Sequence, residues 1–195
     1  MALPATDNFN RADENPLNAN WTGTLNNWRV ISNQAQGTTF NYSAIYWSAD
    51  AFGNDHYSQA VNKQVSDAGP AVRVSAGPKS YHFDAKAGSN TVMQKDVNGT
   101  FTNLQTGLAT PAVNDLMYIE AVGTTIKMKI NGSQIGTDQT DSALATGSAG
   151  LWTYDTTGIV DDFQGDNLGA AGRTTKNTRS WPLGTEIGMG WRQEC

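Results

Sequence analysis

Hydrophobic and polar residues alternate with a period of two in many short segments, which are separated by glycine, asparagine, aspartate and proline. The clearest alternation covers Met117–Ala121 and Ile126–Ile130. Because successive side chains of a strand point to opposite faces, one buried face is predicted to hold Met117, Ile119, Ala121, Ile126, Met128 and Ile130. Helical periodicity is hard to find, so the pattern predicts antiparallel sheets with one face toward water.

Turn signals stand between the alternating segments. Asn98-Gly99 and Asn131-Gly132 readily supply the two positive φ angles of a type I′ hairpin turn, and Gly123-Thr124 joins the two clearest strands. Further strands are predicted at Trp28–Ser32, Ala44–Ser48, His56–Val65, Ala71–Ser75, Tyr81–Lys86, Val92–Val97, Thr100–Leu104, Gly150–Tyr154 and Ile159–Gln164. Roughly a dozen short strands at close spacing favour an all-β sandwich or barrel.

The segment Tyr81–Lys86 alternates strictly between apolar and polar residues. His82 is therefore placed with Asp84 and Lys86 on the face opposite Tyr81 and Phe83. From this placement we predict that His82 is a surface residue.

Charge and length narrow the possible functions. The chain has 195 residues, of which 16% are charged, and carries a net charge of −5 without a basic run. The electrostatic footprint of a nucleic-acid-binding protein is missing, so we expect no such partner. No stretch reaches the length of a membrane-spanning helix, and residues 1–7 lack the basic and apolar regions of a signal peptide. We therefore expect neither membrane insertion nor Sec-type export.

The sequence changes character after Leu168. Residues 1–168 contain nine basic and sixteen acidic residues, a net charge of −7, whereas residues 169–195 contain four basic and two acidic residues, a net charge of +2. We predict a sandwich domain over residues 1–168 and a C-terminal tail that docks on a protein partner. Aromatic and arginine residues are the usual interface anchors, so the expected partner-binding residues are Arg173, Arg179, Trp181, Trp191, Arg192 and Cys195.

The order of several segments resembles the concanavalin A-like lectin/glucanase superfamily, in its laminin-G-like jelly-roll form from bacterial and bacteriophage proteins. The segments are Asp7–Asp13, Trp21, Trp28–Val30, Asp50–Ser58, the hairpin from Tyr118 to Gly132, and Asp161–Phe163. The resemblance covers about Asp7 to Leu168. It implies a two-sheet jelly-roll sandwich in which Asp7–Phe9 pairs with Asp162–Gln164.

Glucanases of this superfamily place their carboxylates on one strand as Glu-x-Asp-x-x-Glu. Asp115 with Glu120, and Asp161 with Asp162 and Asp166, do not reproduce that spacing. Adjacent residues of a strand point to opposite faces, so Asp161 and Asp162 cannot form one acid/base pair. We therefore predict that the protein is not an enzyme, with glycoside hydrolysis as a third alternative because a fold alone does not decide function.

Two further sets of residues leave two interpretations open. Relatives often bind calcium where the terminal strands meet, which would make Asp7, Asp161 and Asp162 oxygen ligands; alternatively, these side chains bond loop amides. Aromatic rings present a similar choice between stacking on sugars and filling or covering the sandwich. The glycan-binding candidates are Trp47, Tyr57, Tyr118, Trp152 and Tyr154.

The phage resemblance, the missing catalytic spacing and the tail together favour a structural or decoration protein of a virion. In this interpretation the tail anchors on a capsid subunit, a phage-tail subunit or a second copy of the chain, and Cys195 is available for a crosslink. The alternative is a carbohydrate-binding module that attaches to a surface. The expected location is the virion in the first case and extracellular in the second.

Overall fold

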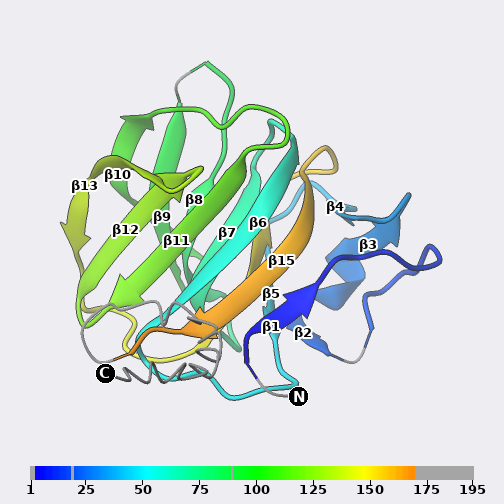
Figure 1. Cartoon of the computed structure of the whole chain (residues 1–195), viewed down its shortest axis with the longest axis horizontal. Coiled ribbons are helices and arrows are strands. Elements are labelled where there is room, and N and C mark those ends of the chain that lie inside the picture. Colours follow the sequence, from blue (N-terminus) through cyan, green and yellow to red (C-terminus); the bar gives the residue numbers. More distant parts are fainter. Residues whose placement is uncertain (1–2, 19, 89, 170–195) are drawn as a thin grey trace, which may run out of the picture.

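The chain folds into two antiparallel sheets packed face to face, which Figure 1 shows with sheet A in front of sheet B. The computed structural model describes residues 3–18, 20–88 and 90–169. The predicted all-β jelly-roll sandwich is confirmed. Within the described residues, no helix is long and apolar enough to cross a membrane.

Sheet A has eight strands, and β1 (Ala5–Asp7) pairs with β15 (Ile159–Asn167) beside the main path. The spatial order of that path is β13 (Ser133–Thr140), β12 (Thr125–Ile130), β11 (Leu116–Val122), β6 (His56–Gln64), β15, β4 (Gln34–Gly37) and β3 (Trp28–Ile31). Asp7 lies opposite Phe163, so the first and last strands pair as predicted, although the pairing runs through Ala5–Asp7 and not through Asp7–Phe9.

Sheet B has seven strands and forms the second layer (Figure 1). Their spatial order is β10 (Thr100–Leu108), β9 (Thr91–Val97), β8 (Lys79–Asp84), β7 (Ala68–Ser75), β14 (Ser148–Thr153), β5 (Ser43–Trp47) and β2 (Trp21–Gly23). A short 3-10 helix, Leu25–Asn27, precedes β3. The strands that the sequence analysis missed are β2, β4 and β13.

The hairpin of β11 and β12 forms as the alternation predicts. Met117 pairs with Ile130, Ile119 with Met128, and Ala121 with Ile126. All of these side chains are buried in the core except Ile130, which is partly buried. The turns at Asn98-Gly99 and Asn131-Gly132 have positive φ at both residues, as their composition requires.

Aromatic side chains join the two sheets at one side of the core. Trp21 and Trp47 from sheet B contact Phe163 from sheet A, with ring centroids 4.7 and 6.0 Å from that of Phe163. The Trp21 Nε1 atom donates a hydrogen bond of 2.9 Å to Asp7 Oδ2. The other oxygen of Asp7 accepts from Phe9 N and Arg11 Nη1. One buried carboxylate therefore ties the first strand to the core.

Replacing Asp7 by asparagine is expected to destabilise the sandwich by about 3 kcal/mol, because an amide N–H₂ would face one of these donors. The free energy of unfolding, measured with urea, checks this value. Asp162→Asn is the matched control, because Asp162 is exposed on the neighbouring strand and asparagine tolerates its positive φ. Equal stability of the two variants would contradict the role of Asp7.

Candidate functional site

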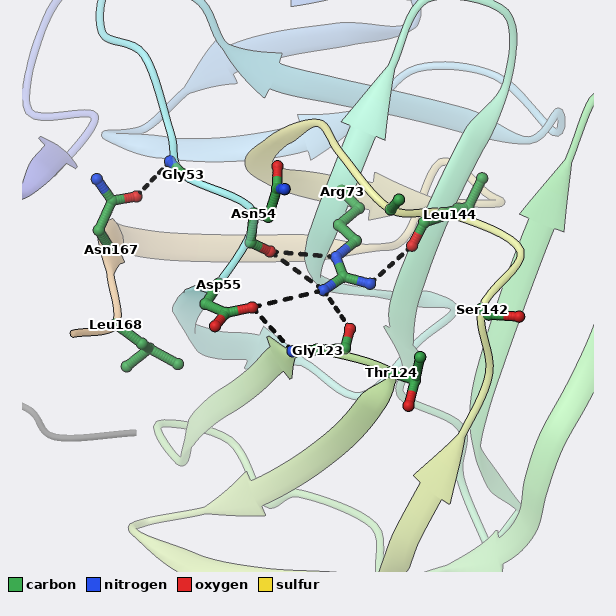
Figure 2. Close-up of a pocket in the computed structure, with 11 residues that line it drawn as sticks. Gly53, Asn54, Asp55, Arg73, Gly123, Thr124, Ser142, Leu144, Asn167 and Leu168 are labelled. Carbon is green, nitrogen blue, oxygen red and sulfur yellow. Dashed lines mark hydrogen bonds and ion pairs between the residues drawn. The ribbon is translucent and has the colours of Figure 1, made fainter. Parts of the chain in front are cut away.

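A pocket of about 600 Å³ lies where loops from both sheets meet at one end of the sandwich. Figure 2 shows Arg73 at its centre, reaching from β7 toward three loops. The Arg73 guanidinium donates to the backbone carbonyls of Asn54, Gly123 and Leu144 over 2.6–3.2 Å. Asp55 contributes an ion pair at 3.9 Å. Arg73 is buried, and its donors are committed to holding loops together.

Removing the guanidinium by Arg73→Met is expected to cost about 3 kcal/mol, because three loop carbonyls lose a charged donor that is itself buried. Arg73 has a positive φ, and methionine, which is likewise unbranched at Cβ, is expected to carry the same backbone strain. Urea unfolding measures the loss. Arg29→Met is the control, because Arg29 is only partly buried and bonds the side chain of Gln36; similar losses in both variants would refute a special role of Arg73.

The outer face of sheet B, which points away from the core, carries a different arrangement. Strand register places Trp152 opposite both Ala44 and Gly69, and His82 opposite both Ala71 and Gln94. The small residues of β7 leave space above the sheet. Into this space the Trp152 and His82 rings lean from either side and stack with centroids 4.1 Å apart.

Two more rings cover this stack from distant parts of the sheet. Tyr42 precedes β5, and Phe101 belongs to β10, yet their centroids lie only 3.6 Å apart in a stacked geometry. Tyr154, beyond the end of β14, lies 4.7 Å from Tyr42. These rings bury Trp152 and His82, whereas Tyr42 and Tyr154 are 42% and 36% exposed. We call Tyr42, Phe101, His82, Trp152 and Tyr154 the aromatic cluster.

A groove of about 380 Å³ runs beside the aromatic cluster. Tyr42, Tyr46 and Trp152 line it together with Thr22 of β2 and Asp96 of β9. Because four strands lie between β2 and β9, the common pocket shows that this face of the sheet is hollowed. Rings beside polar groups in a concavity are typical of ligand sites.

Charged residues adjoin the other side of the cluster. Asp84 is 1% exposed, and Lys86 Nζ lies 2.9 Å from its Oδ2 atom. Burial is the largest influence on Asp84 and raises its pKa to about 7, against the opposing effect of Lys86. Burial also raises the pKa of Asp67, while Lys86 lowers it and Asp155 raises it. Burial lowers the pKa of His82 to about 3, so its ring is neutral.

Two buried polar groups of this face lack hydrogen-bond partners among the described residues. One is the Nε1 atom of Trp152, and the other is the carboxylate of Asp84, which has only the ion pair with Lys86. By contrast, Gln94 Oε1 accepts from His82 Nε2 and Ser80 Oγ donates to His82 Nδ1. Because buried polar groups are normally satisfied, the two exceptions call for a functional explanation.

The prediction that His82 is a surface residue is wrong. The alternation placed it on the correct face, but Trp152 and Phe101 cover that face, and His82 is fully buried. Asp84 is also buried, at 1% exposure. Alternation assigns a side chain to one face of a sheet and does not reveal what covers that face.

The glycan-binding candidates separate into three groups. Trp152 and Tyr154 join the aromatic cluster. Trp47 lies in the core, and its Nε1 atom donates to Asp50. Tyr57 and Tyr118 stack on sheet A, where Tyr118 also bonds Glu120.

The structure brings two of the three calcium candidates together, because Asp7 and Asp162 line one pocket where β1 meets β15, whereas Asp161 is not part of that lining. The carboxylate of Asp7 already accepts three hydrogen bonds. Asp161 accepts from the backbone N–H of Asp162 and lies 3.7 Å from Lys63 Nζ, and Asp162 is exposed. In the part of the chain that the structure describes, no three His, Cys, Asp or Glu residues gather to hold a metal ion, and calcium binding at Asp7, Asp161 and Asp162 stays a prediction.

The predicted partner-binding residues lie outside the described residues. They are Arg173, Arg179, Trp181, Trp191, Arg192 and Cys195. Tail docking, and with it the boundary of the second region, therefore stays a prediction. The sequence analysis missed Tyr42, Phe101, Asp67 and the uncommitted carboxylate of Asp84. The alternation of residues 81–86 was the available signal for Asp84, whereas the contact between Tyr42 and Phe101 depends on the curvature of the sheet.

No family model and no curated protein matches the chain. Among solved structures, it is similar to carbohydrate-binding module CBM66 from Bacillus subtilis, with a TM-score of 0.57 and 22% identity over 76% of this chain and 92% of that one. It is also similar to a galectin-like protein of unknown function from Bacillus subtilis (TM-score 0.53, 8% identity, 84% and 94% covered). It is also similar to a β-1,3-1,4-glucanase from a mouse hindgut metagenome, with a TM-score of 0.53 and 8% identity over 84% of this chain and 99% of that one.

These similarities establish a concanavalin A-like jelly-roll sandwich, as the sequence resemblance indicates. A glucanase and a carbohydrate-binding module both occur among the similar structures. The shared fold therefore does not decide between catalysis and binding.

Asp84→Asn is expected to change how stability depends on pH. The pKa of Asp84 is about 7 in the folded chain and about 4 in an unfolded chain. Between these values the folded state holds the extra proton, so the free energy of unfolding falls as pH rises from 4 to 7. Asparagine does not titrate, so the variant does not show this fall in the free energy of unfolding. At about 1.4 kcal/mol per pH unit, the fall in the wild type is on the order of a few kcal/mol.

Melting temperatures of the Asp84→Asn variant and the wild type, recorded from pH 4 to pH 8, check this expectation. The advantage of the variant should grow up to pH 7 and then level off. Asp162→Asn should show no comparable trend, because Asp162 is exposed. A constant difference between Asp84→Asn and wild type would contradict a buried carboxylate with a raised pKa.

Proposed function

We propose that the protein binds a carbohydrate, without catalysis, at the aromatic cluster of sheet B. The observation that carries this proposal is the meeting of partly exposed tyrosine rings with two buried polar groups that, apart from the Lys86 ion pair of Asp84, have no hydrogen-bond partner among the described residues. The apolar C–H face of a sugar ring stacks on an aromatic side chain, and its hydroxyl groups form directional hydrogen bonds. Tyr154 and Tyr42 supply the rings, while Trp152 Nε1 and Asp84 supply a donor and an acceptor.

The carboxylates of this face do not favour hydrolysis. Glycosidases need two carboxyl groups on opposite sides of the scissile bond. Asp84 is buried beside Lys86. Asp155 accepts from Ser66, Thr157 and Gly158, which fixes it within its loop. These commitments support binding over catalysis.

The virion role expected from the sequence has less support than its carbohydrate-binding alternative. That role depends on the tail, which lies outside the described residues. The similar structures include a protein named as a carbohydrate-binding module. A virion location stays a prediction, as does the extracellular alternative.

Replacing Tyr154 by alanine is expected to weaken glycan binding at least about tenfold, because the variant removes a partly exposed stacking surface. Screening on an array of neutral, acidic and amino-sugar oligosaccharides identifies the ligand, and titration calorimetry then measures the affinity. Tyr118→Ala is the matched control, because Tyr118 is an aromatic candidate on the opposite sheet. Loss of binding in Tyr118→Ala, with Tyr154→Ala unchanged, would place the site on sheet A.

A further inference from the structure

Charged groups of mixed sign surround the exposed end of the aromatic cluster. The backbone N–H of Tyr154 donates to the carbonyl of Asp67, so the two residues adjoin. Lys86 pairs with Asp84 at 2.9 Å, and the charges of both Asp84 and Asp67 act on it. The charges of these same three residues also influence the pKa of Tyr42. Asp67, Asp84 and Lys86 therefore form one charged corner beside Tyr42 and Tyr154.

The charged residues in and near this corner differ in how many hydrogen bonds they already make within the protein and in how exposed they are. Asp155, nearby, is held by loop donors. Asp84 is 99% inaccessible and, apart from Lys86, has no hydrogen-bond partner among the described residues. Lys86 is the exposed member of that ion pair, with 36% of its side chain accessible. The buried carboxylate thus lies next to a partly exposed cation, and its Oδ1 atom has no partner among the described residues.

We infer that the charged corner selects neutral, hydroxyl-rich glycans and rejects anionic ones. This inference rests on the proposed carbohydrate binding and names the class of ligand. The accessible members of the corner are Asp67 and Lys86, and sugar hydroxyl groups can donate to Asp67 and accept from Lys86, so a neutral sugar satisfies both kinds of group.

An anionic sugar meets an unfavourable field at the same place. A ligand carboxylate or sulfate would lie beside Asp67, with Asp155 close by and with Asp84 adding its charge above its pKa of about 7, and only Lys86 would oppose them. Like charges brought together in a partly desolvated site repel strongly. The net charge of −7 over residues 1–168 adds to this repulsion at longer range.

An amino sugar is the less suitable cationic alternative. Lys86 already places an ammonium group next to Asp84 and within the influence of Asp67. A ligand ammonium would have to displace that group or lie beside it. The corner supplies its own cation, and this favours a ligand without charge.

Binding of matched oligosaccharides tests the inference. The probes are galactan oligosaccharides against oligogalacturonates, lactose-terminated glycans against their sialylated forms, and chito-oligosaccharides against their deacetylated forms. The full chain should bind the neutral member of its preferred pair at least tenfold more tightly. Equal or tighter binding of the acidic or amino member, lost in Tyr154→Ala, would overturn the inference while leaving carbohydrate binding intact.

Charge variants separate the local corner from the net charge. Asp67→Asn should reduce the neutral-to-acidic affinity ratio at least threefold, because it removes one carboxylate while keeping its shape. Asp138→Asn, on the exposed edge strand β13, should leave the ratio unchanged. Equal changes in both variants would overturn selection by the corner. Absence of Tyr154-dependent binding to any probe would instead refute the proposed function, and the inference with it.

Discussion

The aromatic cluster depends on the small size of the residues that β7 presents beneath it. Neighbouring strands lie about 4.8 Å apart, so β14 and β8, which flank β7, are separated by about twice that distance. Trp152 and His82 can stack at 4.1 Å only by leaning over β7. There β7 presents Gly69 and Ala71. A Cβ atom on Gly69 would lie 2.1 Å from the carbonyl oxygen of Phe83, so only glycine fits.

Two groups of buried polar residues differ in whether the fold itself satisfies their hydrogen bonds. This difference helps to distinguish residues that stabilise the fold from residues that bind a ligand. Arg73 places its donors on three loop carbonyls and thereby joins the loops of both sheets at one end. Nothing about it calls for a ligand. Within the part of the chain that the structure describes, Asp84 and Trp152 retain polar atoms without a hydrogen-bond partner at comparable burial. Proteins violate local rules mainly where function requires it, so the second group is the better pointer to a site.

The fold could be predicted from local patterns, because most of its strands are short and alternate clearly. The β11–β12 hairpin and the pairing of Asp7 with Phe163 follow from such patterns and from the family resemblance. Strand β13, Ser133–Thr140, was missed because this polar edge strand has little buried alternation. The site was harder to predict, because Tyr42 and Phe101 meet through the curvature of a whole sheet.

The depth of the hollow is already occupied by the protein's own rings. Phe101 covers one face of Tyr42 at 3.6 Å, and Tyr42 in turn borders Trp152. A ligand therefore meets the rim formed by Tyr154 and Tyr42 before it can reach Asp84 or Trp152 Nε1. Stacking on a rim leaves much of the ligand in water, so affinity has to come from few contacts. Charge at the rim then has a large share in the choice of ligand, because little shape complementarity is available to make that choice.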